Sequence, residues 1–571
     1  MPALPFKFAL TSFNAFLAAA VVAVALVAGL IFDPLADLFT ASAFYFIIAA
    51  LTLVGMHFHS QSQQLAATIR QHQTDIAIAG ALGIALMAII FMAVGADFRV
   101  LADETNLLST SQGLFESLEL RNITQVQHYY ESAHIVKAAP AHRPGLFATL
   151  TSLLHFTFGY QWYHGFVLNF IVGVISIGAA YLIFNQLAGR LFGVIAALLL
   201  ASFPMFALNA SSSGFDALNM LMIMLLYWQL FRFLQQPDAR GVQLLLLLLL
   251  LAAQVRYETA LLGVPVAIAI ALQGRQLWQW QYSRFFALIP LLYLPIVWQK
   301  LVSSHFANPG DNKDPFTLEN IGHNVVHMLE FFSDWNNKGL PTLRLTAALA
   351  LVGLLVMAYK HWRGSWKGQW QKSVWIALGL CLLGQILVSC IHFAYYMGDY
   401  QQPWLNRWSQ TQLVWLIPLA ALALHTLLAQ INNKVISSVV LALFMIHGTH
   451  AAMLNPVGKN LNLYRQYKQV RTWLQDNYDT RGTLVISRRS GMYAALGYSA
   501  LNPDSADERQ QSLKSNLQRG LYQQILFVTT YNHRKKENSE QPPKGFKAAK
   551  LVDFQYGGSS SARVYGLTVR K

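Results

Sequence analysis

Charged side chains are scarce in this sequence of 571 residues. Asp, Glu, Lys and Arg together make up 12% of it, about half of the ~25% found in an ordinary soluble domain. Apolar residues make up 55%, and the mean hydropathy is +0.38. This balance excludes a soluble globular enzyme and a disordered chain, because neither carries so much apolar surface.

Cysteine is also rare, and several motifs are missing. The two cysteines, Cys381 and Cys390, are too few for a disulfide scaffold. Both fall inside one apolar run, so we expect them to be small core residues. The sequence contains no Gly-rich phosphate loop, no dinucleotide fingerprint and no metal-type spacing of Cys and His. No internal repeat stands out, and no feature indicates a nucleic-acid partner.

Long apolar runs, in contrast, fill the first 455 positions. A helix needs ~20 mostly apolar residues to cross ~30 Å of hydrocarbon, so the sequence predicts an α-helical polytopic membrane protein with about thirteen transmembrane helices. The first run follows Lys7 as in a signal peptide, but it is too long for one and predicts a retained anchor. The predicted spans are 8–32, 38–58, 74–97, 166–188, 191–209, 214–233, 242–255, 259–272, 285–302, 343–359, 374–396, 411–430 and 435–453.

The basic residues of the short loops predict the orientation. A cytoplasmic N-terminus places Arg70, Arg190 and Arg232 in inside loops, as the positive-inside rule requires. The loops 98–165 and 303–342 then face the outside together with the tail. The apolar stretch 145–165 cannot be a full span without inverting the rest, so it predicts an interfacial or re-entrant helix on the outer side.

The tail is the basic part of the chain. From residue 455 onward it holds 19 Lys and Arg against 8 Asp and Glu, or +11 of the total +15. It either faces an anionic surface or substrate or is a solvated basic domain. Apolar strand-like runs and helical spacings alternate here, which predicts a small α/β domain. The expected helices are 464–478 and 505–518, and the expected strands are 483–487, 525–529, 551–556 and 562–569.

Ionisable groups near hydrocarbon depth are the informative residues, because a charge at the membrane centre costs roughly 2.5–3.5 kcal/mol on insertion scales. All five such features fall on the predicted outer side. They are Asp103-Glu104, His142-Arg143-Pro144, Asp216, Arg256-Tyr257-Glu258 and Arg407.

Each feature has a functional and a structural interpretation. The pair Asp103-Glu104 could accept a proton or hold a divalent ion, or it could cap a helix starting near Asn106. Asp216 suits the start of a helix as well as a site. Arg143 has a planar guanidinium that can bind phosphate in a bidentate manner, or its side chain could simply extend to the water at the membrane interface.

The two remaining features are equally open. Arg256 and Glu258 lie between two short spans, where they could serve a site or pair with each other. Arg407 could bind an anion or anchor its helix at the interface. Taken together, the carboxylates and arginines suit catalysis on a lipid-linked phosphate. A transporter for an anionic substrate is the alternative, although transporters usually place charges near the midplane and show repeats. A structural subunit that recruits a partner through its basic tail is a third possibility.

Several motifs, in order, resemble a known family. They are Arg143-Pro-Gly-Leu-Phe, Leu187-Ala-Gly-Arg-Leu-Phe-Gly193, Ala197-Leu-Leu-Leu-Ala-Ser-Phe-Pro204 and Phe215-Asp216-Ala217-Leu. Over roughly residues 75–300 the chain is similar to the polyprenyl-phosphate-sugar-dependent glycosyltransferases of the GT-C fold. Within these it resembles the superfamily of protein O-mannosyltransferases and lipid A aminoarabinose transferases.

The resemblance implies a role for each charged residue. Asp103 would be the catalytic base, with Glu104 as its companion and Asp216 near the active-site cavity. Arg143, Arg256 and Arg407 would bind the donor phosphate. His142, Tyr257 and Glu258 are candidates for support beside them, and the role of Glu258 stays open. The sequence departs from the family where Gly145 replaces a second proline, which suggests a looser loop. It departs again where Phe203 separates Ser202 from Pro204, and where Arg256-Tyr-Glu258 replaces the commoner Lys-Gly-Pro.

The resemblance also implies an activity and a location. We expect a membrane glycosyltransferase that moves a monosaccharide from a polyprenyl-phosphate donor to a glycan, lipid or protein acceptor, with inversion. The donor is a substrate, no cofactor is certain, and a divalent metal is possible. We expect the protein in the bacterial inner membrane, with its C-terminal domain in the periplasm. The expected units are two additional helices (1–73), a catalytic core with the outer loop 98–165 (74–302), a loop and C-terminal helices (303–454), and the α/β domain (455–571).

Overall fold

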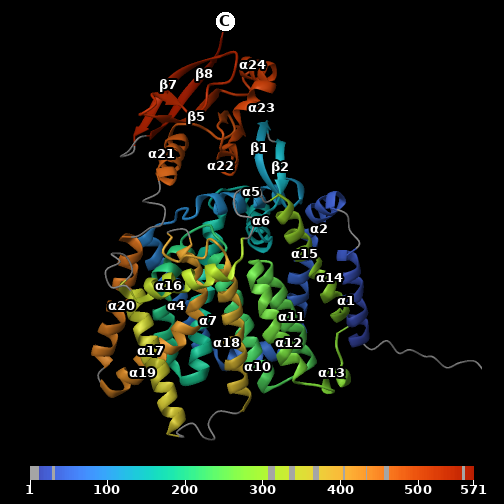
Figure 1. Cartoon of the computed structure of the whole chain (residues 1–571), viewed down its shortest axis with the longest axis vertical. Coiled ribbons are helices and arrows are strands. Elements are labelled where there is room, and N and C mark those ends of the chain that lie inside the picture. The colour runs from blue at the N-terminus through green and yellow to red at the C-terminus, as the bar shows by residue number, and fades with distance from the viewer. Residues whose placement is uncertain are drawn as a thin grey trace, which may run out of the picture.

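The chain forms a bundle of apolar helices with an α/β domain at one end (Figure 1). The computed structural model describes residues 12–28, 32–130, 132–283, 285–306, 315–333, 341–363, 372–402, 405–431, 434–454, 462–555 and 560–570. The ends of the predicted first span, residues 8–11 and 29–31, lie outside the described residues. We call the end of the bundle that carries the α/β domain the domain face.

The apolar helices coincide with the predicted spans. Among the described residues, seven helices are long and apolar enough to cross a membrane, or eight if a bent pair counts as one span; shorter apolar helices accompany them. The polytopic helical fold is therefore confirmed, and the count of thirteen stays a prediction. The helices of the bundle are α1 (Ser12–Ala28), α2 (Phe32–His59), α4 (Gln73–Val94), α7 (His164–Ala188), α8 (Arg190–Ser202), α9 (Pro204–Ala210), α10 (Asp216–Gln235), α11 (Ala239–Ala253), η1 (Tyr257–Leu262), α12 (Gly263–Ala271), α13 (Gln276–Gln279), η2 (Phe286–Leu288), α14 (Ile289–Leu292), α15 (Leu294–Phe306), α17 (Pro341–Trp362), α18 (Lys372–Ala394), α19 (Leu413–Ile431) and α20 (Lys434–Leu454).

The predicted span 191–209 is not one straight helix. It consists of α8 and α9, which meet at an angle of 71°. The bend lies at Pro204, because proline lacks a backbone N–H and forces the preceding Phe203 into an extended conformation. All seven residues of α9 are buried, so the bend directs the chain through the core toward Asp216.

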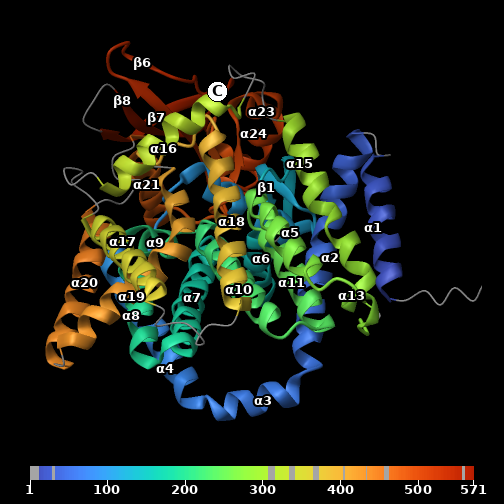
Figure 2. The same ribbon diagram turned by 60° about the horizontal axis from the view of Figure 1, so that its bottom comes forward.

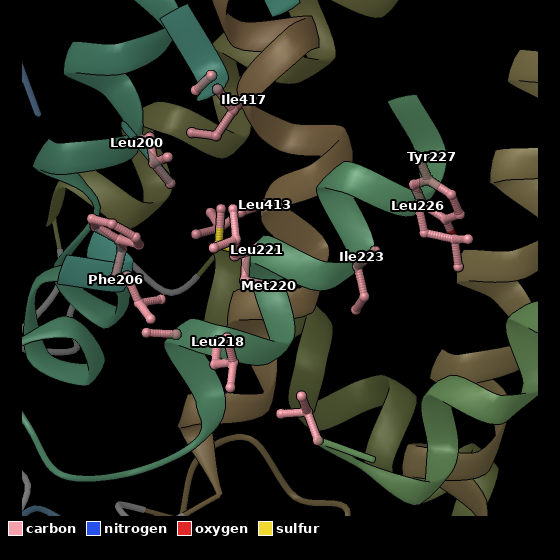
Figure 3. Packing of buried hydrophobic residues seen from close by; sticks show 14 of the residues in the cluster. Leu200, Phe206, Leu218, Met220, Leu221, Ile223, Leu226, Tyr227, Leu413 and Ile417 are labelled. Carbon is pink, nitrogen blue, oxygen red and sulfur yellow. The ribbon is translucent and has the colours of Figure 1, made fainter. Parts of the chain in front are cut away.

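Helix α10 lies at the centre of the apolar core. It packs against α7, α11 and α18, and Figure 3 shows Leu218 and Leu221 of α10 together with Leu413 of α19 and Phe206 of α9. Close packing of this kind leaves little freedom to its first turn. The position of Asp216, the first residue of α10, is therefore fixed by the core.

The longer helices outside the predicted spans are α3 (Ser62–Gln71), α5 (Leu101–Ser117), α6 (Leu146–Phe158) and α16 (Leu318–Ser333). Helix α5 begins at Leu101, before the expected start near Asn106, so Asp103 and Glu104 lie in its first turn. Helix α6 is a separate short helix within the stretch 145–165, as predicted. Helix α3, which carries Arg70, lies at the opposite end of the bundle from the α/β domain (Figure 2).

The tail folds as the expected α/β domain. The predicted strands and the helix 464–478 are present, the predicted helix 505–518 is divided into two helices at Arg509, and the turn at 556–559 lies outside the described residues. The elements are α21 (Asn462–Asn477), β3 (Thr483–Ile486), α22 (Ser490–Ala494), β4 (Ser499–Leu501), α23 (Pro503–Glu508), α24 (Gln510–Gln518), β5 (Gln524–Asn532), β6 (Glu537–Asn538), β7 (Phe546–Gln555) and β8 (Ser560–Val569).

The sheet of this domain is not built from the tail alone. A hairpin from the loop 98–165, made of β1 (Arg121–Tyr129) and β2 (Ser132–Pro140), joins it in the order β2-β1-β4-β3-β5-β8-β7, with β6 on β5. Strand β3 is parallel to β4 and β5, and the other pairs are antiparallel. Val126 of β1 pairs with Ala500 of β4. The hairpin was not predicted from the sequence, and its place in the sheet is set by β4, which lies more than 350 residues away in the chain.

The two cysteines differ in burial. Both are free thiols on α18, where Cys381 is half-buried and packs against the apolar core, whereas Cys390 is exposed. The expectation that both are small core residues is therefore wrong for Cys390. An apolar run specifies a helix, but it does not specify which side of that helix packs inward when nearly every residue is apolar.

Candidate active site

The predicted charged residues meet at the domain face of the bundle. They come from five separate segments of the chain, each of which ends or begins a helix there. Asp103 lies in the first turn of α5, Arg143 between β2 and α6, Asp216 at the start of α10, Arg256 just before η1, and Arg407 in η3 (Asn406–Gln412).

Their side chains form one continuous series of ion pairs, which we call the ion-pair chain. Asp103 accepts a bond from Arg143 on Oδ1 and one from Arg407 on Oδ2, the latter at 2.5 Å. Arg407 also reaches Oδ2 of Asp216 at 3.4 Å. Positive and negative groups thus alternate.

The series continues on the other side of Asp216. Arg256 donates to Asp216 through Nη1 and to Glu258 through Nε at 2.6 Å. His392 Nε2 lies 3.2 Å from the same Glu258 oxygen. The pairing of Arg256 with Glu258, one of the two interpretations left open above, is therefore present, but both residues also belong to the larger series.

The ion-pair chain is buried except at one end. The side chains of Arg407, Arg256 and Asp216 are 7–9% exposed, whereas that of Arg143 is 41% exposed. An anionic ligand approaching from solvent therefore meets Arg143 first.

Aromatic rings enclose the buried arginines. The Arg256 guanidinium lies 5.1 Å from the ring of Phe215 and 5.5 Å from that of Trp408. His392 stacks on Trp408 with ring centroids 4.7 Å apart. Because these faces are apolar and exclude water, they strengthen each charge–charge contact beside them.

Asp103 is held as a carboxylate. Burial opposes its ionisation, but the cations Arg407 and Arg143 outweigh burial and hold the pKa of Asp103 well below its usual range. A carboxylate in this state accepts a proton poorly. The group therefore becomes an effective base only when one of its arginines is engaged elsewhere.

Glu104, its neighbour in sequence, has a different environment. Its Oε1 accepts the backbone N–H groups of Arg99 and Val100, both at 2.9 Å, and its Oε2 accepts that of Ser213 at 3.1 Å. Burial raises the pKa of Glu104 to about 7, although these N–H bonds act in the opposite direction. Glu104 thus ties the start of α5 to the turn that precedes Asp216.

The supporting residues lie beside the ion-pair chain rather than within it. The Tyr257 hydroxyl donates to the backbone carbonyl of His142 at 2.8 Å, which joins η1 to the Arg143 loop. Burial and the Arg143 cation lower the pKa of His142. Gly145 does not loosen this loop as expected, since a Cβ there would lie 2.8 Å from Cδ1 of Ile47. The loop is closely packed against α2.

Two groups of this site, His392 and Arg99, and one group outside it, Asp97, were not identified from the sequence. His392, in the middle of a predicted span, extends the ion-pair chain. Arg99 is buried and donates to Asn209, and burial lowers the pKa of Arg99 to about 10. Asp97 binds Arg471 at 3.0 Å and Lys468 of α21. The presence of Arg99 and His392 within or next to apolar runs is the signal that could have found them.

The described residues do not form a metal site. Asp103, Asp216 and Glu258 are each bound by arginine, and Glu104 is occupied by backbone N–H groups. Nowhere in the described ranges do three His, Cys, Asp or Glu side chains group so that they could hold a metal ion. Arginines balance the carboxylates where a cation would otherwise be needed.

Two known structures are similar to this chain over most of its length, at low sequence identity. An archaeal oligosaccharyltransferase from Archaeoglobus fulgidus, in complex with an inhibitory peptide and a dolichol-phosphate, is 12% identical over 80% of this chain and 69% of its own, with a TM-score of 0.42. ArnT from Cupriavidus metallidurans, bound to undecaprenyl phosphate, is 13% identical over 85% of this chain and 97% of its own, with a TM-score of 0.44. None of the curated protein sequences matches the chain.

A family match covers the part of the chain that carries most of the site. Residues 142–301 match the family of dolichyl-phosphate-mannose-protein mannosyltransferases. This segment contains Arg143, Asp216, Arg256 and Glu258, four members of the ion-pair chain. The resemblance to protein O-mannosyltransferases that the sequence indicated is therefore confirmed over residues 142–301.

Proposed function

We propose that the chain transfers a monosaccharide from a polyprenyl-phosphate donor to an acceptor, with inversion at the anomeric carbon. The observation that carries the proposal is the position of Asp103 between Arg143 and Arg407. A general base next to phosphate-binding cations is what glycosyl transfer from a lipid phosphate requires. The family match over residues 142–301 supports the same class of reaction.

Arg143 receives the donor phosphate in this proposal. Its side chain is the exposed end of the ion-pair chain, and a guanidinium can bind phosphate in place of a carboxylate. When Arg143 turns to the phosphate, Asp103 loses one of the two cations that depress its pKa. Donor binding thereby converts Asp103 from a structural ion-pair partner into a base.

The chemical step is a single displacement. The acceptor hydroxyl or amine attacks the anomeric carbon from the side opposite the phosphate, and Asp103 takes its proton. The bond between the anomeric carbon and the phosphate oxygen breaks, and the electron pair leaves with the polyprenyl phosphate. Arg143 and Arg256 stabilise the charge that develops on this phosphate, while Arg407 and Asp216 hold Asp103 and Arg256 in place.

The remaining residues position these groups. Glu104 fixes the start of α5 to the turn 211–214, and Asn169 holds the same turn through the carbonyls of Ser212 and Gly214, both at 2.7 Å. Glu258 and His392 orient Arg256. Placement of such groups to within a fraction of an ångström is a large part of enzymatic rate enhancement.

We place the domain face on the outer, periplasmic side of a bacterial inner membrane. The basic residues Arg70, Arg190 and Arg232 support this orientation under the positive-inside rule. We also retain the four units 1–73, 74–302, 303–454 and 455–571, with the hairpin 121–140 of the second unit completing the sheet of the fourth.

The test uses the purified full chain in nanodiscs with a panel of radiolabelled polyprenyl-phosphate sugars. Release of free polyprenyl phosphate is followed for the wild type and for Asp103→Asn. We expect release with at least one donor, and loss of that release in the variant. If no donor reacts even with membrane extract as the source of acceptor, the transferase proposal is wrong and transport of an anionic lipid-linked sugar becomes the better explanation.

A further inference from the structure

The α/β domain contains a cleft that lies apart from the ion-pair chain. Its volume is about 350 Å³, within the range of small-ligand sites. The cleft is bordered by α21, by the loop after β3 and by the end of β5. We propose that it binds a phosphorylated monosaccharide, or the terminal sugar phosphate of a glycan, independently of the transfer reaction.

The topology of the sheet places the cleft where ligands bind in open α/β sheets. Strand β3 is the first of the three parallel strands; β4 lies on one side of it and β5 on the other. The chain therefore leaves β3 in one direction and β4 in the other, which opens a crevice at the carboxyl ends of β3 and β5. Ser487 follows β3, Thr529 lies near the end of β5, and both line the cleft.

Two arginines that line the cleft favour a phosphate. Arg488 and Arg489 follow β3, line the cleft and are exposed. Ser487 and Thr530 also line the cleft, and their hydroxyls can donate to a phosphate oxygen. The excess of basic residues in the tail, with a formal charge of +11, attracts anions to this domain.

Three other residues that line the cleft favour a sugar. Glu540 is held by the hydroxyls of Thr529 at 2.6 Å and Ser539 at 2.7 Å, and its carboxylate can accept from sugar hydroxyls. Tyr467 and Tyr493 supply aromatic rings with centroids 6.0 Å apart. A bare phosphate would use the arginines but could not donate the hydrogen bonds that a sugar hydroxyl offers to the Glu540 carboxylate.

The cleft is connected to the ion-pair chain through one helix. Tyr467 lines the cleft from α21, and the next residue on that helix, Lys468, binds Asp97, as does Arg471. Asp97 precedes Arg99 and the start of α5. A ligand in the cleft therefore lies one helix away from the segment that carries Asp103.

The test is isothermal titration calorimetry on the full chain in detergent. The probes are glucose 6-phosphate, mannose 6-phosphate and glucosamine 6-phosphate, with glucose and inorganic phosphate for comparison. The double variant Arg488→Gln/Arg489→Gln removes the cations of the cleft. The matched control Arg534→Gln/Lys535→Gln removes two exposed cations from the turn after β5, outside the cleft. Arg143→Ala separates this cleft from the ion-pair chain.

We expect at least one sugar phosphate to bind at least tenfold more weakly to the Arg488/Arg489 variant. Binding to the control and to Arg143→Ala stays within twofold of wild type, and glucose and phosphate each bind at least tenfold more weakly than the sugar phosphate. Both arginines are exposed, so the variant keeps the thermal unfolding temperature of the wild type. The proposal is overturned if no sugar phosphate binds, if binding depends on Arg143 instead, if the control loses as much affinity, or if inorganic phosphate binds equally well.

Discussion

The ion-pair chain and the cleft of the α/β domain both contain arginines, but those of the ion-pair chain are mostly buried and those of the cleft are exposed. In the ion-pair chain Arg256 and Arg407 are buried, and each contacts two carboxylates. In the cleft of the α/β domain, Arg488 and Arg489 are exposed, and Glu540 is the one acidic residue that lines the cleft with them. The arginines of the ion-pair chain are therefore already neutralised by carboxylates, whereas those of the cleft are available to a ligand.

The difference follows from the cost of burying a charge. An isolated ion in a low-dielectric interior costs several kcal/mol, which a partner of opposite charge offsets. The buried site must therefore balance its charges within the protein, and under the proposed function the donor phosphate would displace a carboxylate from Arg143. The exposed cleft has no such requirement, because water screens its arginines.

The largest expected effect is a loss of unfolding free energy when a buried arginine is replaced, and it tests whether the buried arginines stabilise the fold. Arg407→Met leaves Asp103 and Asp216 without a shared partner, and breaking a buried pair costs about 3–5 kcal/mol of unfolding free energy. Arg143→Met, at the exposed end, should cost at most about 1 kcal/mol, as exposed pairs do. Denaturant titration of the purified protein in detergent measures both losses. Equal losses for the two variants would contradict the contrast between buried and exposed arginines.

The second prediction concerns turnover rather than stability. Asp103→Asn should reduce the rate of transfer by at least ~10²–10³, the usual effect of losing one preorganised charged group, while the protein stays folded. Asp97→Asn is the matched control: Asp97 is also paired with cations, but at α21. We expect that variant to retain the rate to within a few-fold. A near-normal rate for Asp103→Asn removes Asp103 from the role of base.

A third variant sharpens the comparison by loosening the junction between the two regions. Val126 of β1 is fully buried where the hairpin meets the domain, so Val126→Ala should cost about 1–3 kcal/mol through lost contacts and a cavity. Because the hairpin joins the helix of Asp103 to Arg143, the rate should also fall several-fold. Thermal unfolding and turnover are compared with Lys137→Ala on the exposed face of β2. If Val126→Ala unfolds earlier but keeps its full rate, the hairpin does not position the site.

The smallest effect depends on pH and concerns Glu104. Burial raises its pKa to about 7 from an ordinary value of 4.5, so between these values the folded state binds more protons than the unfolded state. Stability contributed by this group is therefore fully present below about pH 4.5 and is lost as the pH rises toward 7. The advantage of wild type over Glu104→Gln in unfolding temperature should shrink between pH 5 and pH 8. An advantage that grows with pH would show that Glu104 is stabilised as the carboxylate.

The sequence predicted most helices and the charged residues of the site. Apolar runs mark helices reliably because a membrane span must be apolar along its whole length. Charges such as Arg256 and Glu258 stood out because they interrupt these runs. The break at Pro204 and the buried Arg99 were equally visible as residue types, but their consequences depended on neighbours distant in the chain.

What the sequence determined by itself is the set of apolar helices, the α/β character of the tail and the residue types of the site. The tertiary structure alone decided the order of pairing, in which Arg407 connects Asp103 with Asp216 and Arg256 connects Asp216 with Glu258. It also decided that the hairpin 121–140 joins a sheet of the tail. Helices and strands can be predicted from the spacing of apolar residues, which is a property of neighbouring positions in the sequence. Which charges and strands meet depends on contacts between residues hundreds of positions apart, and these are fixed only when the helices pack and the buried charges find partners.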